Sequence, residues 1–221
     1  FVMEKKKNDF IAQGSILAVA SILVRVMGMI YRIPMTAIIG DKGNGFYSYA
    51  YSVYTILLLL SSYSLPLAVS KMVSAKAQLG QWRNVKRVFI CAIAFAIGIG
   101  TTFGLTVLIG AQFFTRVFFH SELAAIALRF MAPTILIMAL LGVFRGFFQG
   151  LQNTLPTAVS QIVEGLINAI MSVVFAYFLF DFGHGMDVAS GTTDLGYAWG
   201  AAGGAIGTGA GALAGLIFCF I

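Results

Sequence analysis

The sequence contains little charge. Asp, Glu, Lys and Arg make up only 10% of its 221 residues, whereas 59% are apolar; soluble domains carry about 25% charged residues. A soluble fold of this length could not cover its surface with so few charged and polar groups. The high apolar content also excludes disordered chains and collagen. The composition therefore predicts an integral membrane protein.

Cysteine and histidine are also scarce, with two of each. Cys91 and Cys219 lie inside apolar runs, whereas His120 and His184 stand alone in polar connections. Neither a disulfide framework nor a metal site is therefore expected. The glycine-rich stretch 203–211 follows no strand and has no Lys-Ser or Lys-Thr pair, so it is not a phosphate-binding loop. Because no nucleophile–base pair is evident either, we expect no enzyme activity, no cofactor and no metal.

Positive charge exceeds negative charge, with 14 Lys and Arg against 8 Asp and Glu, but it is too sparse for a nucleic-acid surface. Its distribution instead indicates membrane orientation, because short cytoplasmic loops are enriched in Lys and Arg. Eight basic residues lie in the N-terminal tail and around the second polar connection: Lys5, Lys6, Lys7, Lys71, Lys76, Arg83, Lys86 and Arg87. The first and third connections hold only Lys42 and Arg116. We expect a cytoplasmic N-terminus and no nucleic-acid partner.

Six apolar runs are long enough to cross a bilayer, whose core of about 30 Å requires roughly 20 helical residues. They cover residues 14–39, 46–70, 88–110, 123–147, 157–180 and 196–221. The short alternating segments of a membrane β-barrel are absent. The expected fold is therefore all-α: a polytopic bundle of six transmembrane helices that follows a basic tail at residues 1–13. Because the sequence begins at Phe1 and stops inside an apolar run, we also expect a piece of a longer protein.

Two arginines lie inside the first run. Arg25 is 11 residues from its start, which places it about 16 Å deep at 1.5 Å per residue. An arginine at that depth costs about 2.5–3.5 kcal/mol on insertion scales, so it needs a partner or a hydrated cavity. Arg32 lies two turns further on the same face, with Gly28 between them. We predict that Arg25 binds a ligand, whereas Arg32 either joins it or extends to the headgroups.

The fifth run carries a polar stripe. Gln161, Glu164, Asn168 and Ser172 recur at helical spacing on an otherwise apolar helix, and such a stripe faces a hydrated cavity or other helices. Arg145 adds a cation at the end of the fourth run. Glu164 is left with two candidate partners, Arg145 and Arg25. Together these residues predict a helical bundle around a cationic, hydrated cavity. The residues that we expect to bind its substrate are Arg25, Arg32, Arg145, Gln161, Glu164 and Asn168.

The sixth run is rich in glycine. Gly203, Gly207, Gly211 and Gly215 recur at every fourth residue, which places them on one helix face. Such a face allows close helix packing, although glycine also weakens a helix by about 1 kcal/mol per residue and could make it flexible. Pro34 interrupts or ends the first run, as proline often does where a membrane helix bends. We predict packing or hinge roles for these residues and for Gly28.

Tyrosines gather at the outer end of the second run, at Tyr47, Tyr49, Tyr51 and Tyr54. Aromatic residues are enriched at membrane interfaces, so an aromatic belt explains the cluster. A surface for stacking sugars is the alternative. The sequence leaves both interpretations open.

Several strings resemble those of bacterial polysaccharide-transport flippases. They are Leu23–Pro34, Ile39–Asp41, Gly45–Tyr47, Leu65–Lys71, Arg145–Asn153, Pro156–Ala158 and Ser160–Gln161. The resemblance is to the stage V sporulation protein B-like branch, related to the lipid II flippases, in the multidrug/oligosaccharidyl-lipid/polysaccharide exporter superfamily. It departs at the second run, where Ile56–Leu60 carries no charge.

The resemblance implies a two-lobed, multi-pass transporter of the bacterial cytoplasmic membrane, of which this chain forms the N-terminal lobe and lacks the C-terminal lobe. The implied substrate is an undecaprenyl-pyrophosphate-linked oligosaccharide, lipid II or a related wall precursor, flipped by alternating access. Arg25 and Arg32 match the arginine pair that binds the pyrophosphate. Glu164 either holds Arg25 or takes part in coupling to a cation. The alternatives are a cation-coupled multidrug exporter and a membrane enzyme or scaffold of wall synthesis.

Overall fold

The computed structural model describes the backbone of residues 2–220 and the side chains of residues 14–189 and 191–220. Its elements are α1 (Val2–Ser61), α2 (Leu65–Gln78), α3 (Trp82–Phe119), α4 (Ala124–Gly150), α5 (Leu155–Ser190) and α6 (Leu195–Phe220). The all-α prediction is confirmed over residues 2–220. The predicted basic tail continues into α1, and its side chains Lys5, Lys6 and Lys7 lie outside the described residues.

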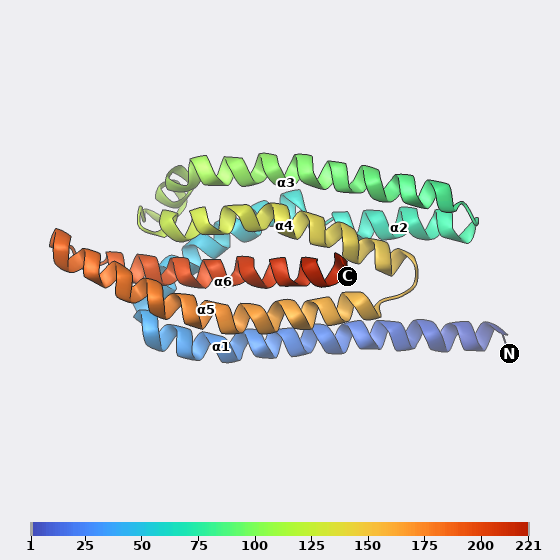
Figure 1. Cartoon of the computed structure of the whole chain (residues 1–221), viewed down its shortest axis with the longest axis horizontal. Coiled ribbons are helices and arrows are strands. Elements are labelled where there is room, and N and C mark those ends of the chain that lie inside the picture. The colour runs from blue at the N-terminus through green and yellow to red at the C-terminus, as the bar shows by residue number, and fades with distance from the viewer. Residues whose placement is uncertain (1, 221) are drawn as a thin grey trace.

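The prediction of six separate membrane-spanning helices is wrong. The described residues contain five helical segments long and apolar enough to span a membrane, and the first, Gly14–Gln78, holds both predicted runs 14–39 and 46–70. The expected loop at 40–45 is replaced by one non-helical residue, Gly40, with φ 63° and ψ −178°. Glycine adopts this left-handed φ without the strain that a Cβ would introduce. Figure 1 shows α1 running along the bundle and then turning back at this point.

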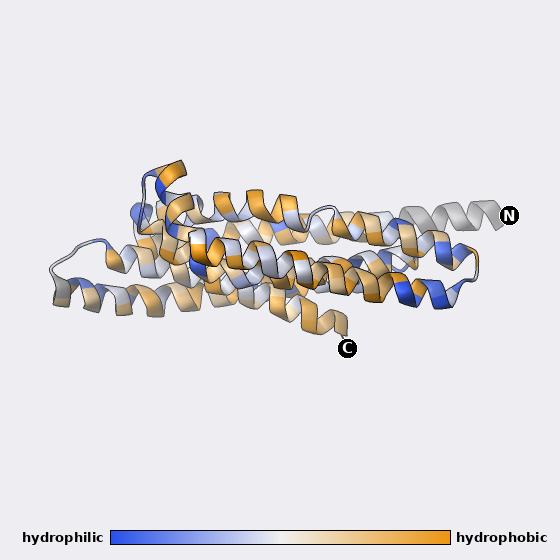
Figure 2. Cartoon of the chain, turned by 90° about the horizontal axis from the view of Figure 1, so that it is seen from above, coloured by the Kyte–Doolittle hydropathy of each residue, from blue (hydrophilic) through white to orange (hydrophobic). Residues whose placement is uncertain are grey.

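The predicted runs 88–110 and 157–180 lie within α3 and α5, which extend beyond them, whereas the runs 123–147 and 196–221 correspond closely to α4 and α6 over the described residues. The 38 residues of α3 and 36 of α5 exceed the roughly 20 residues that cross a bilayer core. The basic stretch 71–87 comprises the end of α2, a short turn and the start of α3. Figure 2 shows hydrophilic residues concentrated towards the two ends of the bundle.

The close pairing of α5 and α6 depends on the glycines of α6. A Cβ on Gly203 would meet the backbone of Phe175 and Ala176, and one on Gly207 would meet Ser172. At Gly211 a Cβ would lie 2.6 Å from the carbonyl oxygen of Glu164. The two backbones therefore approach as closely as the small-residue face allows. This packing fixes the α5 stripe against the centre of the bundle.

Candidate functional site

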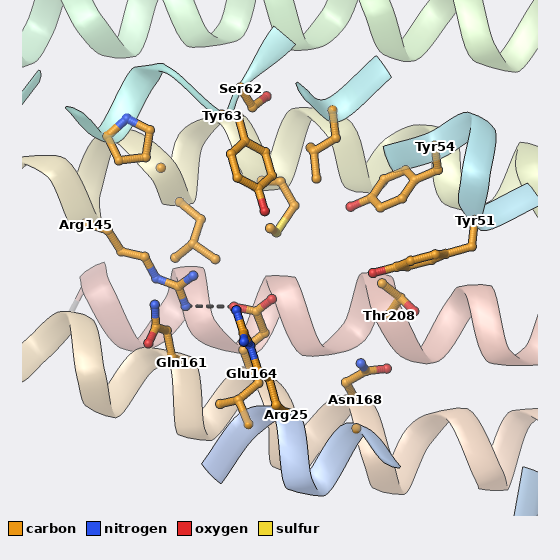
Figure 3. A pocket seen from close by; sticks show the side chains of 18 of the residues that line it. Arg25, Tyr51, Tyr54, Ser62, Tyr63, Arg145, Gln161, Glu164, Asn168 and Thr208 are labelled. Carbon is orange, nitrogen blue, oxygen red and sulfur yellow. Dashed lines mark hydrogen bonds and ion pairs between the residues drawn. The ribbon is translucent and has the colours of Figure 1, made fainter. Parts of the chain in front are cut away.

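A cavity of about 880 Å³ lies among the helices, with lining residues from α1, α2, α4, α5 and α6 (Figure 3). All six residues predicted to bind substrate line it: Arg25, Arg32, Arg145, Gln161, Glu164 and Asn168. Gly28, which separates the two arginines of α1, lines it as well. Residues from five helices, distant in sequence, thus surround one space. Its volume is within the usual range for ligand-binding pockets.

Glu164 pairs with Arg145. Arg145 Nη2 lies 2.7 Å from Glu164 Oε2, and the two side chains are only 12% and 23% exposed. Arg145 Nε also donates a hydrogen bond to Ser160 Oγ at 2.9 Å. Of the two partners left open by the sequence, the structure therefore selects Arg145. The pair joins the end of α4 to the start of α5 across a short connection.

Arg25 and Arg32 differ from Arg145 in their surroundings. Within the described side chains the ion pairs are Lys42–Asp194, Arg116–Glu122 and Arg145–Glu164, so neither arginine of α1 has one there. In Figure 3 the Arg25 side chain extends from α1 towards Arg145 and Glu164. The charged lining residues are Arg25, Arg32, Arg145 and Glu164, which leaves an excess of two positive charges. The cavity is therefore electrostatically suited to an anion.

The polar stripe of α5 divides between two environments. Gln161, Glu164 and Asn168 line the cavity, whereas Ser172 is fully buried, with its Oγ 2.8 Å from Asn168 Oδ1 and 3.2 Å from the Gly204 carbonyl oxygen. The Ser21 hydroxyl donates to the Leu17 carbonyl at 2.9 Å and lies 3.5 Å from Gln161 Oε1. The Ser172 contact therefore orients the amide of Asn168, which lines the cavity.

Of the residues predicted to serve packing or hinge roles, Gly28 lines the cavity and the others lie elsewhere. Pro34 is inside α1 and exposed, and the helix continues through it to the break at Gly40. Gly203, Gly207 and Gly211 contact α5 and are not lining residues of the cavity. The backbone of α1 thus departs from helical geometry at Gly40, six residues after Pro34, where the sequence had predicted a bend.

Five tyrosines line the cavity and were not predicted as site residues: Tyr31, Tyr47, Tyr51, Tyr54 and Tyr63. A usable signal was present, because positions 47, 51 and 54 share one helix face at spacings of four and three. Tyr49, between them, is on another face and stacks on Phe119 with ring centroids 4.7 Å apart. The sequence therefore located the cluster but did not show which of its members face inward.

The site offers little for metal coordination. In residues whose side chains are described, no group of three or more His, Cys, Asp or Glu could hold a metal ion. The single carboxylate lining the cavity, that of Glu164, is engaged by Arg145. The guanidinium groups that line the cavity can bind an anion. The uncharged amides and hydroxyls beside them can donate and accept further hydrogen bonds.

Comparison with known proteins agrees with these features. The chain is 26% identical over 200 residues to lipid II flippase MurJ of Bacillus subtilis, which covers 86% of this chain and 37% of the relative. Stage V sporulation protein B of the same organism is 26% identical over 216 residues, covering 97% and 39%. The chain thus spans less than two fifths of the length of these relatives, and no solved structure matches it.

The apolar helices and these relatives identify a multi-pass membrane protein. The family described as polysaccharide biosynthesis protein matches residues 10–221, nearly the whole chain. The chain therefore belongs to the polysaccharide biosynthesis protein family.

Proposed function

We propose that this chain forms one lobe of a transporter that flips an undecaprenyl-pyrophosphate-linked oligosaccharide across the bacterial cytoplasmic membrane by alternating access. The observation that carries the proposal is the pair Arg25 and Arg32 in the cavity, without an ion pair among the described side chains. The second lobe belongs to the rest of such a transporter, in keeping with the greater length of the relatives. The role is transport rather than catalysis.

The energetics of Arg25 support an anionic substrate. An arginine at the centre of a membrane helix costs about 2.5–3.5 kcal/mol on insertion scales. Arg25 and Arg32 line the cavity with exposed side chains, and neither has a carboxylate partner among the described side chains. A diphosphate supplies oxygens that a guanidinium group binds in bidentate fashion. Arg145, which Glu164 neutralises, instead positions the end of α4.

The proposed orientation places the N-terminus in the cytoplasm. Figure 1 shows the N-terminus, the α2–α3 turn and the α4–α5 connection at one end of the bundle. The basic tail and the basic flanks of the α2–α3 turn therefore share that end, as the enrichment of Lys and Arg in cytoplasmic loops requires. Substrate would enter from this end.

The charge of the cavity distinguishes this proposal from a multidrug exporter. An exporter of cationic drugs needs unpaired acidic groups, whereas Glu164, the one carboxylate among the described lining residues, is paired with Arg145. A cavity with two excess positive charges repels organic cations. Coupling of transport to a cation stays a separate proposal for Glu164, whose carboxylate would have to leave Arg145 to bind it.

The test is complementation of a strain depleted of its lipid-linked oligosaccharide flippase, using the full-length gene product. Arg25→Ala is expected to abolish rescue at normal protein level, because the diphosphate loses its central cation. Arg116→Ala, which removes an exposed arginine outside the cavity paired with Glu122, serves as the control and should rescue normally. Full rescue by Arg25→Ala would exclude the role proposed for this residue.

A further inference from the structure

We infer that one end of the cavity is a carbohydrate subsite, built on Tyr51 and its neighbours Tyr47 and Tyr54. The inference rests on the proposed function, because it assigns the sugar portion of the same substrate to a separate part of the cavity. The three residues are called the tyrosine face below.

The tyrosine face is held rigidly. Tyr47 and Tyr54 are only 1% and 3% exposed, whereas Tyr51 between them is 38% exposed. The Tyr51 ring stacks on Tyr47 with centroids 5.8 Å apart and packs at a tilt on Tyr54 at 5.9 Å. The Tyr47 hydroxyl lies 3.4 Å from Thr208 Oγ1 of α6. Two buried rings thus fix a third ring that is accessible from the cavity.

The groups beside this ring are neutral and polar. Figure 3 shows the hydroxyl groups of Tyr51, Tyr54 and Tyr63 directed into the cavity, with Thr208 and Asn168 on the facing helices. Phenol and alcohol hydroxyls and amides both donate and accept hydrogen bonds. A sugar ring presents the complementary surface, with many hydroxyls and C–H groups that pack on the electron-rich face of an aromatic ring.

Other ligands fit this end less well. A prenyl chain cannot form hydrogen bonds with the hydroxyl groups that converge here. If it bound at this end, those hydroxyls would lose their hydrogen bonds with water without replacement. An organic cation could lie on the tyrosines, but Arg25 and Arg32 line the same cavity and would repel it. These arginines are seven residues apart, or about 10 Å along the helix. A diphosphate held by them would carry its sugar into contact with the tyrosine face.

The test compares two synthetic probes on the purified full-length gene product in detergent. Farnesyl pyrophosphate reports on the anion site, and farnesyl-pyrophosphoryl N-acetylglucosamine reports on both sites. We expect the sugar-bearing probe to bind the unaltered protein more tightly. Tyr51→Ala should lower its affinity about threefold to tenfold and leave farnesyl pyrophosphate within twofold, as measured by isothermal titration calorimetry.

Tyr49→Ala is the matched control. Tyr49 lies two residues away on α1 and is also 38% exposed, but it stacks on Phe119 outside the cavity. It should leave the affinity for both probes unchanged. Tyr51→Phe keeps the packing on Tyr47 and Tyr54 and removes only the hydroxyl. If Tyr51→Ala fails to fold, the Phe variant carries the test, with an expected loss of about threefold for the sugar-bearing probe alone.

The outcomes separate this inference from the proposed function. Equal affinity of both probes for the unaltered protein, or an equal loss for both in the Tyr51 variants, overturns the carbohydrate subsite. Binding of farnesyl pyrophosphate that disappears in Arg25→Ala leaves the proposed function standing in that case. If neither probe binds, both proposals fail. Binding of tetraphenylphosphonium that depends on Tyr51 overturns the inference in favour of an organic-cation site.

Discussion

At the scale of single residues, the ion pair of Arg145 and Glu164 shows how charged side chains are accommodated inside the bundle. The pair is largely buried, and its two groups are joined at 2.7 Å. Burial of two charges is expensive, so such a pair adds little net stability compared with apolar residues. Removal of one partner is different, because it leaves the other charge buried and uncompensated.

We predict that Glu164→Gln destabilises the protein through Arg145. The expected loss is about 1–3 kcal/mol in the free energy of unfolding, at or below the range for breaking a buried pair, because the site borders a hydrated cavity. The double variant Arg145→Gln/Glu164→Gln should recover part of this loss. Thermal unfolding in detergent of the single and double variants provides the measurement. Strictly additive losses would show that the two residues do not interact.

The sequence predicted the charged residues of the cavity better than its tyrosines, for a physical reason. Arg25 and Glu164 are expensive inside apolar runs, so their positions alone indicate a polar interior. A tyrosine inside an apolar run has no comparable insertion cost, and tyrosines are common both at membrane interfaces and in protein cores. Its position alone therefore does not indicate a cavity. The choice between Tyr49 and Tyr51 depended on where the neighbouring helices lie, which the sequence did not reveal. The choice of Arg145 over Arg25 as partner of Glu164 depended on the same information.

At the scale of helices, α1 breaks at Gly40, the first residue of the connection expected at 40–45, and not at Pro34. Proline is tolerated within membrane helices when neighbouring groups satisfy the freed carbonyl, and α1 continues through Pro34. Gly40 instead adopts the left-handed φ that a sharp turn needs. The glycines of α6 were located correctly as one face, because their period of four is close to the helical repeat. Only the structure identifies α5 as their partner.

We predict that Gly40→Ala destabilises the fold by about 1–3 kcal/mol, because φ 63° with ψ −178° lies in a region of backbone conformation that essentially only glycine adopts. Crowding is not the cause, since the nearest atom to the added Cβ would be Tyr197 Cε1 at an ordinary 3.6 Å. Gly45→Ala is the control, because that position is helical and nothing lies within 4 Å of the added Cβ. It should be neutral or stabilising by up to about 1 kcal/mol. Similar melting temperatures for the two variants would contradict the assignment of strain to Gly40.

At the scale of the whole molecule, apolar run length predicted the helical bundle but not the number of separate segments. The runs around residues 14–39 and 46–70 were counted apart because glycine and charge lie between them. In the structure, residues 41–45 are helical, and the two runs belong to one segment. The positions of Lys and Arg carry further information, because the basic tail and the α2–α3 turn meet at one end of the bundle (Figure 1). The fold is therefore consistent with a single membrane orientation.

The proposed orientation, with a cytoplasmic N-terminus, predicts opposite accessibility at the two ends of α3. In a background with Cys91 and Cys219 replaced by serine, a single cysteine is introduced at Gln81, in the α2–α3 turn, or at Ser121, after α3. A membrane-impermeant thiol reagent added to intact cells should label Ser121→Cys and leave Gln81→Cys unlabelled, because basic turns stay in the cytoplasm. Permeabilised cells control for burial, since both positions should then react. Labelling of Gln81→Cys alone in intact cells would reverse the orientation, and with it the side from which substrate enters the cavity.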